Sequence, residues 1–278
     1  MKRRFARIYP VYVLAILILF IYYLAIHKEI DYYGLLLNIL MIQSWIPNYA
    51  LSFNTPGWSL SVELFFYITF PFLFNHFYKK LPLKKLILPL FICFIISQIV
   101  LHVLLNSIFF EGHPSASHNF TYYFPLMHFS EFLIGNLAGL FFLKVIKIKN
   151  YDLPIISLIM LTVIVLKINI RISYHNGMLA FLFIPIIILI SANNGQITKI
   201  SNMKLPVFLG EISYSIYILQ KPIFLWVNKI MHYLSLDNKI IIFYSATLIL
   251  IIISGVSYTY FETPLRKRIN KKVIITTT

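Results

Sequence analysis

The sequence is poor in cysteine and in charged side chains. Its one cysteine, Cys93, lies inside an apolar stretch, which excludes a disulfide framework and a multi-cysteine metal site. Charged residues make up 12% of the 278 positions, about half the share of a typical soluble domain. Metal-ligand spacings, a glycine-rich phosphate loop and a dinucleotide fingerprint are also absent from the sequence. We therefore expect no permanently bound cofactor and no metal.

The chain is rich in long hydrophobic segments. Hydrophobic residues make up 59% of it, and long apolar runs recur from end to end. Since a bilayer core needs about 20 helical residues per crossing, we predict an all-α, multi-pass bundle that forms one membrane domain over residues 1–278, without a soluble domain. The first apolar stretch lacks the small-residue cleavage site of a signal peptide. Eight spans are expected, at 8–26, 57–77, 83–108, 123–143, 152–168, 177–192, 205–228 and 237–260.

The net charge of +15 is better explained by the membrane topology of the chain than by nucleic-acid binding. Basic residues gather between the apolar runs, as in cytoplasmic loops. The shorter stretch 32–46 is therefore interpreted as a re-entrant or interfacial helix, because a full span there would invert every later loop. Both termini are then predicted to be cytoplasmic. Among the 24 Lys and Arg, this topology leaves outside the cytoplasm only Lys28, Lys167, Arg171, Lys221, Lys229 and Lys239.

One carboxylate inside an apolar run, Glu63, lies close to a break in the chain. A charge in a membrane helix costs at least a few kcal/mol, so it usually faces the bundle interior and is often functional. Pro56 and Gly57 precede this helix, and Ser59 shares a helical face with Glu63. The pattern predicts either a polar site near the outer end of the helix or a buried glutamate that packs against a neighbour.

Two further carboxylates, Glu131 and Glu211, are better explained by structural roles. Glu131 follows His128 by three residues, so the two side chains share a face, either to orient a base or to satisfy two buried polar groups. Glu211 is followed by Tyr214 and Ser215, but no G-x-S-x-G elbow surrounds the serine, which argues against a hydrolase.

The chain begins with a basic cluster, KRRFARIYP. Arg4 and Arg7 share a helical face, and with Arg3 they lie at the predicted cytoplasmic end of the first span. Guanidinium groups there suit the phosphates of a cytosolic cofactor. Orientation of the helix by positive charge alone explains the cluster equally well.

Five pieces of the sequence, in order, resemble the acyltransferase-3 family of membrane O-acyltransferases, which includes O-antigen and exopolysaccharide acetylases. The resemblance implies transfer of an acyl group, usually acetyl, from cytosolic acyl-CoA to a hydroxyl of an envelope glycan. The pieces are RRFARIYPVY at 3–12, WSLSVELFFYITFP at 58–71, FPLMHFSEFLIG at 124–135, FLGEISYSIYILQKP at 208–222 and SYTYFETPLRKRI at 257–269.

The resemblance implies roles for the residues that match the family's motifs. The basic motif implies a site for the CoA donor at Arg3, Arg4 and Arg7. The tryptophan–serine–glutamate motif implies an acceptor side at Trp58, Ser59 and Ser61. Glu63 and His128 are the residues expected to assist catalysis, and polar structural roles are expected for Glu131, Glu211, Tyr214 and Gln220.

The chain departs from the family pattern in two ways. The family fold, of about ten helices, normally begins with two helices that hold a histidine thought to be the main base, whereas this sequence starts at the basic motif. We therefore expect an N-terminally incomplete domain, or a separate polypeptide that supplies those helices. Gln220 stands where many members have histidine.

The expected function is thus acyl transfer in a bacterial inner membrane, with lipid, a glycan and acyl-CoA as partners and without nucleic acid. A proton-coupled transporter is an alternative, since mid-membrane carboxylates suit one, but inverted repeats are absent from the sequence. An inactive remnant is another alternative.

Overall fold

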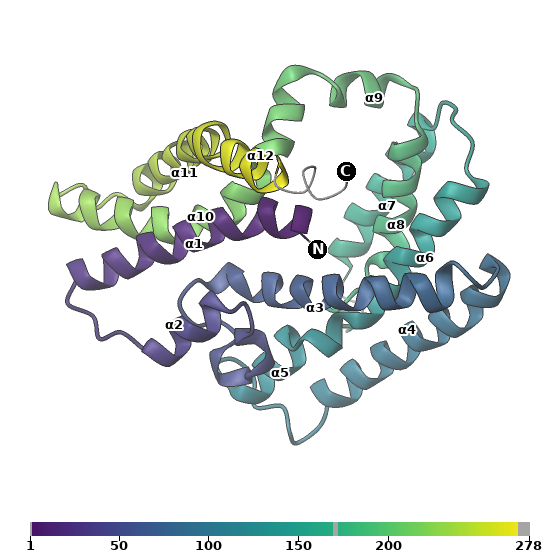
Figure 1. Ribbon diagram of the computed structural model, residues 1–278, viewed down its shortest axis with the longest axis horizontal. Coiled ribbons are helices and arrows are strands. Elements are labelled where there is room, and N and C mark those ends of the chain that lie inside the picture. Colours follow the sequence, from purple (N-terminus) through teal and green to yellow (C-terminus); the bar gives the residue numbers. More distant parts are fainter. Residues whose placement is uncertain (1, 169–171, 272–278) are drawn as a thin grey trace. The chain divides into compact units, whose positions relative to one another are not determined.

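The computed structural model describes residues 2–168 and 172–271 (Figure 1). Regular structure in the described part of the chain is helical, and its β features are limited to an isolated bridge between Lys149 and Asn193. The all-α prediction is therefore confirmed. The chain divides into two compact units, Met1–Ser61 with Val207–Thr278, and Val62–Pro206.

The first unit joins the two ends of the sequence. Short 3₁₀ turns at Gln43–Trp45, Pro47–Tyr49 and Thr55–Gly57 connect its second helix to the start of α3. Its helical elements are α1 (Lys2–Ala25), α2 (Tyr32–Ile39), the first residues of α3 (Trp58–Leu73), most of α10 (Lys204–Tyr233), α11 (Lys239–Val256), the π-helical η6 (Ser257–Glu262) and α12 (Thr263–Lys271).

In this unit α1 and α10 run parallel. Tyr214 Oη donates to the carbonyl of Ile8 at 2.8 Å, and Lys229 Nζ donates to the carbonyl of Ala25 at 2.8 Å. The α12 helix packs against α1. Because Ser215, next to Tyr214, bonds to Glu262 just before α12, the α12 contact lies at the Ile8 end of α1. The basic start and basic end of the chain therefore meet at one end of this unit, as expected if both lie on one side of a membrane.

The second unit contains the remaining helices. Within it α4 packs against α6, α6 against α8, and α7 against α8. The elements after α3 are the π-helical η4 (Phe74–Tyr78), α4 (Leu83–Leu105), α5 (Ala116–Tyr123), the 3₁₀ turn η5 (Pro125–His128), α6 (Phe129–Val145), α7 (Asp152–Lys167), α8 (Ala180–Ala192) and α9 (Gln196–Ser201).

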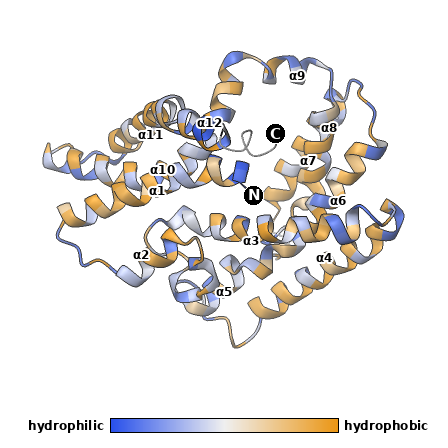
Figure 2. Ribbon diagram, in the orientation of Figure 1, coloured by the Kyte–Doolittle hydropathy of each residue, from blue (hydrophilic) through white to orange (hydrophobic). Residues whose placement is uncertain are grey.

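Among the described residues, five helical segments are long and apolar enough to cross a membrane. They are Lys2–Ala25, Thr55–Tyr78, Leu83–Leu105, Ala116–Lys144 and Lys239–Asn270, and the long hydrophobic helices stand out in Figure 2. Three other expected spans form helices outside this set: α7 with 16 residues, α8 with 13, and α10, which has 30 residues but lacks an 18-residue stretch that is sufficiently apolar and uncharged. The count of eight spans and the cytoplasmic placement of the termini therefore stay predictions.

The stretch 32–46 folds as an eight-residue helix followed by a turn. At a rise of about 1.5 Å per residue, α2 is far shorter than a bilayer core. It lies against α1, where Tyr12 Oη donates to Asn38 Oδ1 at 3.1 Å. Its length agrees with the prediction of a non-spanning segment.

Gly57 fixes the start of α3. Its carbonyl accepts a hydrogen bond from Gln43 Nε2 at 2.7 Å, so backbone and amide lie close together. A Cβ at this position would lie 2.9 Å from Tyr12 Oη and 3.2 Å from Gln43 Nε2. A side chain larger than hydrogen therefore does not fit between α1 and the turn that leads into α3.

We expect Gly57→Ala to destabilise the detergent-solubilised protein by about 1–3 kcal/mol, the usual cost of overpacking a filled site. Gly139→Ala is the matched control, because no other atom lies within 4 Å of a Cβ added there and alanine favours a helix. Thermal unfolding of both variants measures the difference. Equal unfolding temperatures would contradict the close packing of Gly57 against Tyr12.

Candidate functional site

The basic motif occupies the first two turns of α1. Arg3, Arg4 and Arg7 are exposed there, and the next residue, Ile8, gives its carbonyl to Tyr214 of α10. This contact holds α10 against the motif, and the structural role of Tyr214 stays a prediction.

A buried carboxylate, Glu262, lies at the same end of the unit. Its Oε1 accepts hydrogen bonds from Ser215 Oγ at 2.5 Å and from Ser257 Oγ at 3.1 Å. The sequence pattern had placed Ser215 beside Glu211, one turn away on α10. The structure instead joins Ser215 to Glu262, and Glu211 is exposed, so the structural role of Glu211 stays a prediction.

The start of α3 carries a cluster of hydroxyl groups around Ser59. Ser59 Oγ lies 3.0 Å from Tyr217 Oη, and each of these oxygens lies 3.1 Å from the carbonyl oxygen of Pro56. Trp58 is half-buried beside them in sequence, and Ser61 is fully buried. Within the described part of the chain, the Ser61 hydroxyl has no hydrogen-bond partner.

Lys221 ties α10 to the segment that precedes α3. Its Nζ donates to the carbonyl of Phe53 at 2.5 Å and to Thr55 Oγ1 at 2.8 Å. Gln220, its neighbour, is half-buried. The contacts of Lys221 and Tyr217 with this segment were not predicted, because both residues lie more than 150 residues away along the chain and no local spacing connects them.

Glu63 is half-buried on α3, one turn after Ser59 and within the second unit. Tyr67 Oη donates to Glu63 Oε2 at 2.7 Å. This hydrogen bond holds the carboxyl group in one orientation. This contact could have been predicted from the sequence, since Tyr67 follows Glu63 by four residues and so shares its helical face.

His128 and Glu131 are in contact, as their spacing predicted. His128 Nδ1 lies 2.9 Å from Glu131 Oε1, and Nε2 lies 2.8 Å from the carbonyl oxygen of Tyr122. Both ring nitrogens of His128 therefore have polar partners in the described structure.

Two other imidazole rings, those of His175 and His118, lie against Tyr122, whose carbonyl contacts His128. The His175 ring lies 4.5 Å from that of Tyr122 between ring centroids, and the His118 ring lies 4.6 Å from it. Desolvation, and then the nearby His128 and His118, lower the pKa of His175, against a smaller opposing effect of Glu131. His175 thus favours its neutral form beside the pair. The place of His175 near His128 and Glu131 was not predicted, because His175 lies in the segment before α8, far along the chain.

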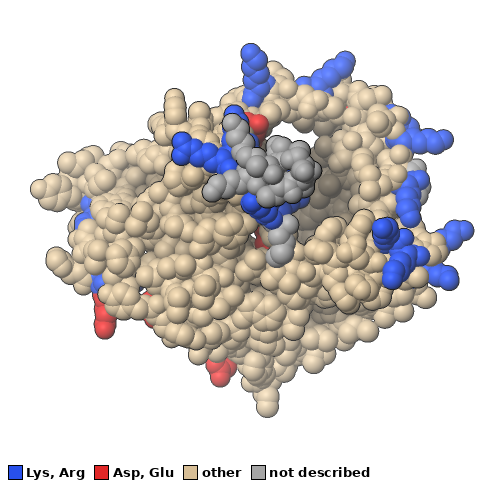
Figure 3. Space-filling view, viewed as in Figure 1, with Lys and Arg blue, Asp and Glu red and all other residues tan. Residues whose placement is uncertain are grey.

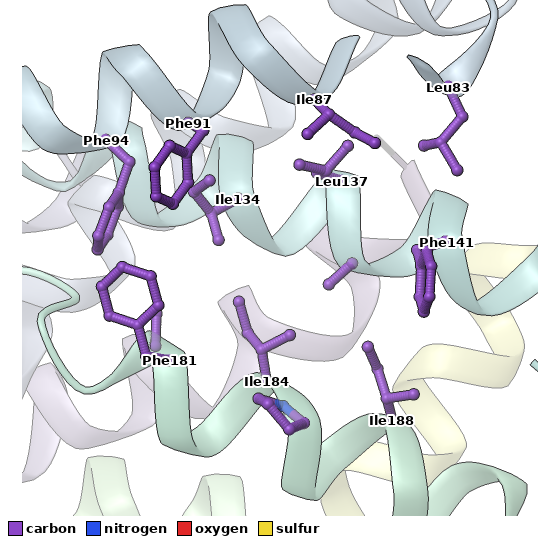
Figure 4. A pocket seen from close by; sticks show the side chains of 13 residues that line it. Leu83, Ile87, Phe91, Phe94, Ile134, Leu137, Phe141, Phe181, Ile184 and Ile188 are labelled. Atoms are coloured by element: carbon purple, nitrogen blue, oxygen red, sulfur yellow. The ribbon is translucent and has the colours of Figure 1, made fainter.

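The second unit also contains an open apolar pocket of about 320 Å³ between α4, α6 and α8. Phe91 and Phe94 of α4 and Phe181 of α8 line one end, and Leu83 and Phe141 line the other (Figure 4). Its lining holds no titratable side chain, so this pocket offers no group for acid–base chemistry. Searched over the described residues, the structure contains no group of three or more His, Cys, Asp or Glu placed to hold a metal ion.

Comparison with known proteins identifies the family. The sequence matches the acyltransferase-3 family, described as an acyltransferase domain, over residues 1–259. It is 37% identical to the acyltransferase MdmB of Streptomyces mycarofaciens over 92 residues, which are 31% of this chain and 24% of that protein. It is 24% identical to the O-acetyltransferase OatA of Staphylococcus aureus over 227 residues, 76% of this chain and 36% of that protein.

The chain thus spans about a third or less of the length of these curated relatives. No solved structure matches it significantly. The family match covers most of the chain and includes the basic motif, the α3 motif and the His128 segment. The chain therefore belongs to the acyltransferase-3 family.

Proposed function

We propose that the protein transfers an acetyl group from acetyl-CoA to a hydroxyl of a cell-envelope glycan, in a bacterial inner membrane that it crosses several times. The observation that carries the proposal is the family match over residues 1–259. The relative named as an O-acetyltransferase, OatA, supports acetyl as the group and oxygen as the acceptor atom. The long apolar helices support the membrane setting.

The donor end of the reaction is assigned to the basic motif. Arg3, Arg4 and Arg7 are exposed on the first turns of α1, where guanidinium groups suit the phosphates of CoA. In this proposal the arginines hold the carrier and take no part in bond making.

The acceptor end is assigned to the start of α3. Ser59 and Ser61 supply hydroxyl groups there, and Trp58 supplies an aromatic surface on which a sugar ring can pack. Since the Ser61 hydroxyl is buried without a partner among the described residues, a hydrogen bond from a bound ligand would offset the cost of about 1–3 kcal/mol that such a group carries.

The chemical step is an ordinary acyl transfer. The acceptor oxygen attacks the thioester carbonyl carbon, the new C–O ester bond forms, the C–S bond breaks, and the proton of the hydroxyl ends on the released thiol. Glu63, held by Tyr67 at 2.7 Å, is proposed to accept the hydrogen bond of the attacking hydroxyl and draw off its proton. For His128, whose two ring nitrogens lie within hydrogen-bond distance of Glu131 and of the Tyr122 carbonyl, we propose an assisting role rather than that of the base.

Deleting the gene from its host tests the function. We expect O-acetyl esters to disappear from one envelope glycan, as seen by mass spectrometry of that glycan before and after mild alkali, which removes such esters. A plasmid copy should restore them, and a Glu63→Gln copy should not. An unchanged glycan profile in the deletion strain would contradict the proposal.

A further inference from the structure

The basic start of α1 is electrostatically unfavourable by itself. The helix begins with Lys2, Arg3 and Arg4 and has no acidic residue in its first turn. The amino end of a helix carries a partial positive charge, so cations there are unfavourable, whereas anions are stabilised. The arrangement therefore favours an anion bound at this end.

A second basic helix lies beside the first. The sequence of α12, TPLRKRINK, places Arg266, Lys267 and Arg268 in its middle, and α12 packs against α1. In Figure 3 Lys and Arg side chains gather over the region that Figure 1 labels α12. Two helices from opposite ends of the sequence thus bring cations together within one unit.

Glu262 lies between these two sources of charge. It is 8% exposed, and its Oε1 is held by the hydroxyls of Ser215 and Ser257. Its carboxylate interacts electrostatically with both Arg266 and Arg7. Arg266 follows it by four residues, so the two lie on neighbouring turns, and Arg7 comes from α1. Glu262 thus interacts with one arginine from each helix, which places both arginines near the same carboxyl group.

We infer that Arg7 of α1 and Arg266 of α12 form a phosphate clamp that Glu262 positions. The ligand class is a phosphate monoester or diester, from either the CoA carrier or the headgroup of an anionic lipid. The CoA form rests on the proposed function and adds a second helix to its donor site. Glu262 is a positioning residue here, because it touches the serines and attracts the arginines rather than meeting the ligand.

The test measures binding of CoA and of 3′-dephospho-CoA to purified protein in phosphatidylcholine nanodiscs, and retention of phosphatidylglycerol from mixed nanodiscs. Arg7→Gln and Arg266→Gln should each weaken binding of one phosphate ligand about ten- to hundred-fold, the usual loss of a charge-assisted contact. Lys239→Gln is the control, since it removes the same charge from the start of α11. It should leave binding unchanged.

Glu262→Gln gives the most discriminating result. By simple electrostatics, removal of a negative charge should strengthen binding of an anion. If Glu262 positions the clamp, the same substitution should instead weaken binding, about three- to tenfold, while the amide oxygen still accepts from Ser215. Tighter binding by Glu262→Gln would overturn the positioning role. Should that variant fail to fold, Arg266→Gln still decides whether α12 takes part.

The two proposals fail in different ways. If Arg7→Gln weakens CoA binding and Arg266→Gln changes neither CoA nor lipid binding, the donor site stands and the clamp is overturned. If both variants lose phosphatidylglycerol and neither changes CoA binding, the clamp stands with lipid as its ligand, and the CoA site at the basic motif is wrong. If no variant changes either ligand, both fail.

Discussion

Replacing Glu63 by glutamine should lower acyl transfer by about a hundred- to ten-thousand-fold, the usual contribution of acid–base catalysis, and leave the protein folded. Glutamine keeps the size of the side chain and still accepts the hydrogen bond from Tyr67, but it cannot take a proton from a hydroxyl. Rates are measured in native membranes that carry each variant, normalised to the amount of folded protein.

Two further variants sharpen this result. Glu211→Gln removes the same charge from an exposed position on α10 and should change the rate little. Tyr67→Phe removes the hydroxyl that lies 2.7 Å from Glu63 Oε2 and should lower the rate about ten- to hundred-fold, since a hydrogen bond to a charged group is worth about 1.5–3 kcal/mol. A Glu63→Gln protein that keeps more than a tenth of the normal rate would remove Glu63 from the chemistry.

Replacing Glu131 by glutamine should lower stability more than activity. The carboxylate accepts from His128 Nδ1 at 2.9 Å, and the His128 side chain is only 10% exposed. Glutamine can still form a hydrogen bond with the ring, but it removes the negative charge, so the contact loses its charge-assisted part. We expect about 1 kcal/mol of destabilisation, the difference between a hydrogen bond to a charged group and one to a neutral group, as a lower unfolding temperature in detergent.

A double-mutant cycle separates this contact from other effects. His128→Gln and Glu131→Gln should each destabilise, and together they should cost less than the sum of the two, because both remove the same contact. Glu111→Gln, in an exposed loop position, is the charge control. A stable but inactive Glu131→Gln protein would instead place Glu131 in the chemistry.

The parts of the fold that sequence predicted are those set by local pattern. Apolar length predicted the helices, and a three-residue spacing predicted the contact of His128 with Glu131. The shortness of α2 followed from the charge distribution in the loops, since a span at 32–46 would have inverted the later ones. The helices and the His128 contact depend on residues close together in the chain, whereas the interpretation of 32–46 depends on the order of charged loops along it.

The contacts that sequence did not predict depend on how helices turn toward one another. Ser215 shares a face with Glu211 by spacing, yet it bonds to Glu262, 47 residues away. Ser59 meets Tyr217 across 158 residues, and Lys221 reaches Phe53 across 168. Spacing places a residue on a face of its helix but does not state which helix that face meets, so pairs of this kind need the tertiary structure.

The central claim is that this protein moves an acetyl group from CoA to a glycan hydroxyl. Its most direct test supplies acetyl-CoA, labelled in the acetyl group, to sealed inside-out membrane vesicles that contain the envelope glycan, and follows label and free thiol together. The account predicts one thiol released for each alkali-labile acetyl ester gained by the glycan, and neither product with the Glu63→Gln protein. Thiol release without labelled glycan, or labelled glycan at the normal rate with Glu63→Gln, would contradict it.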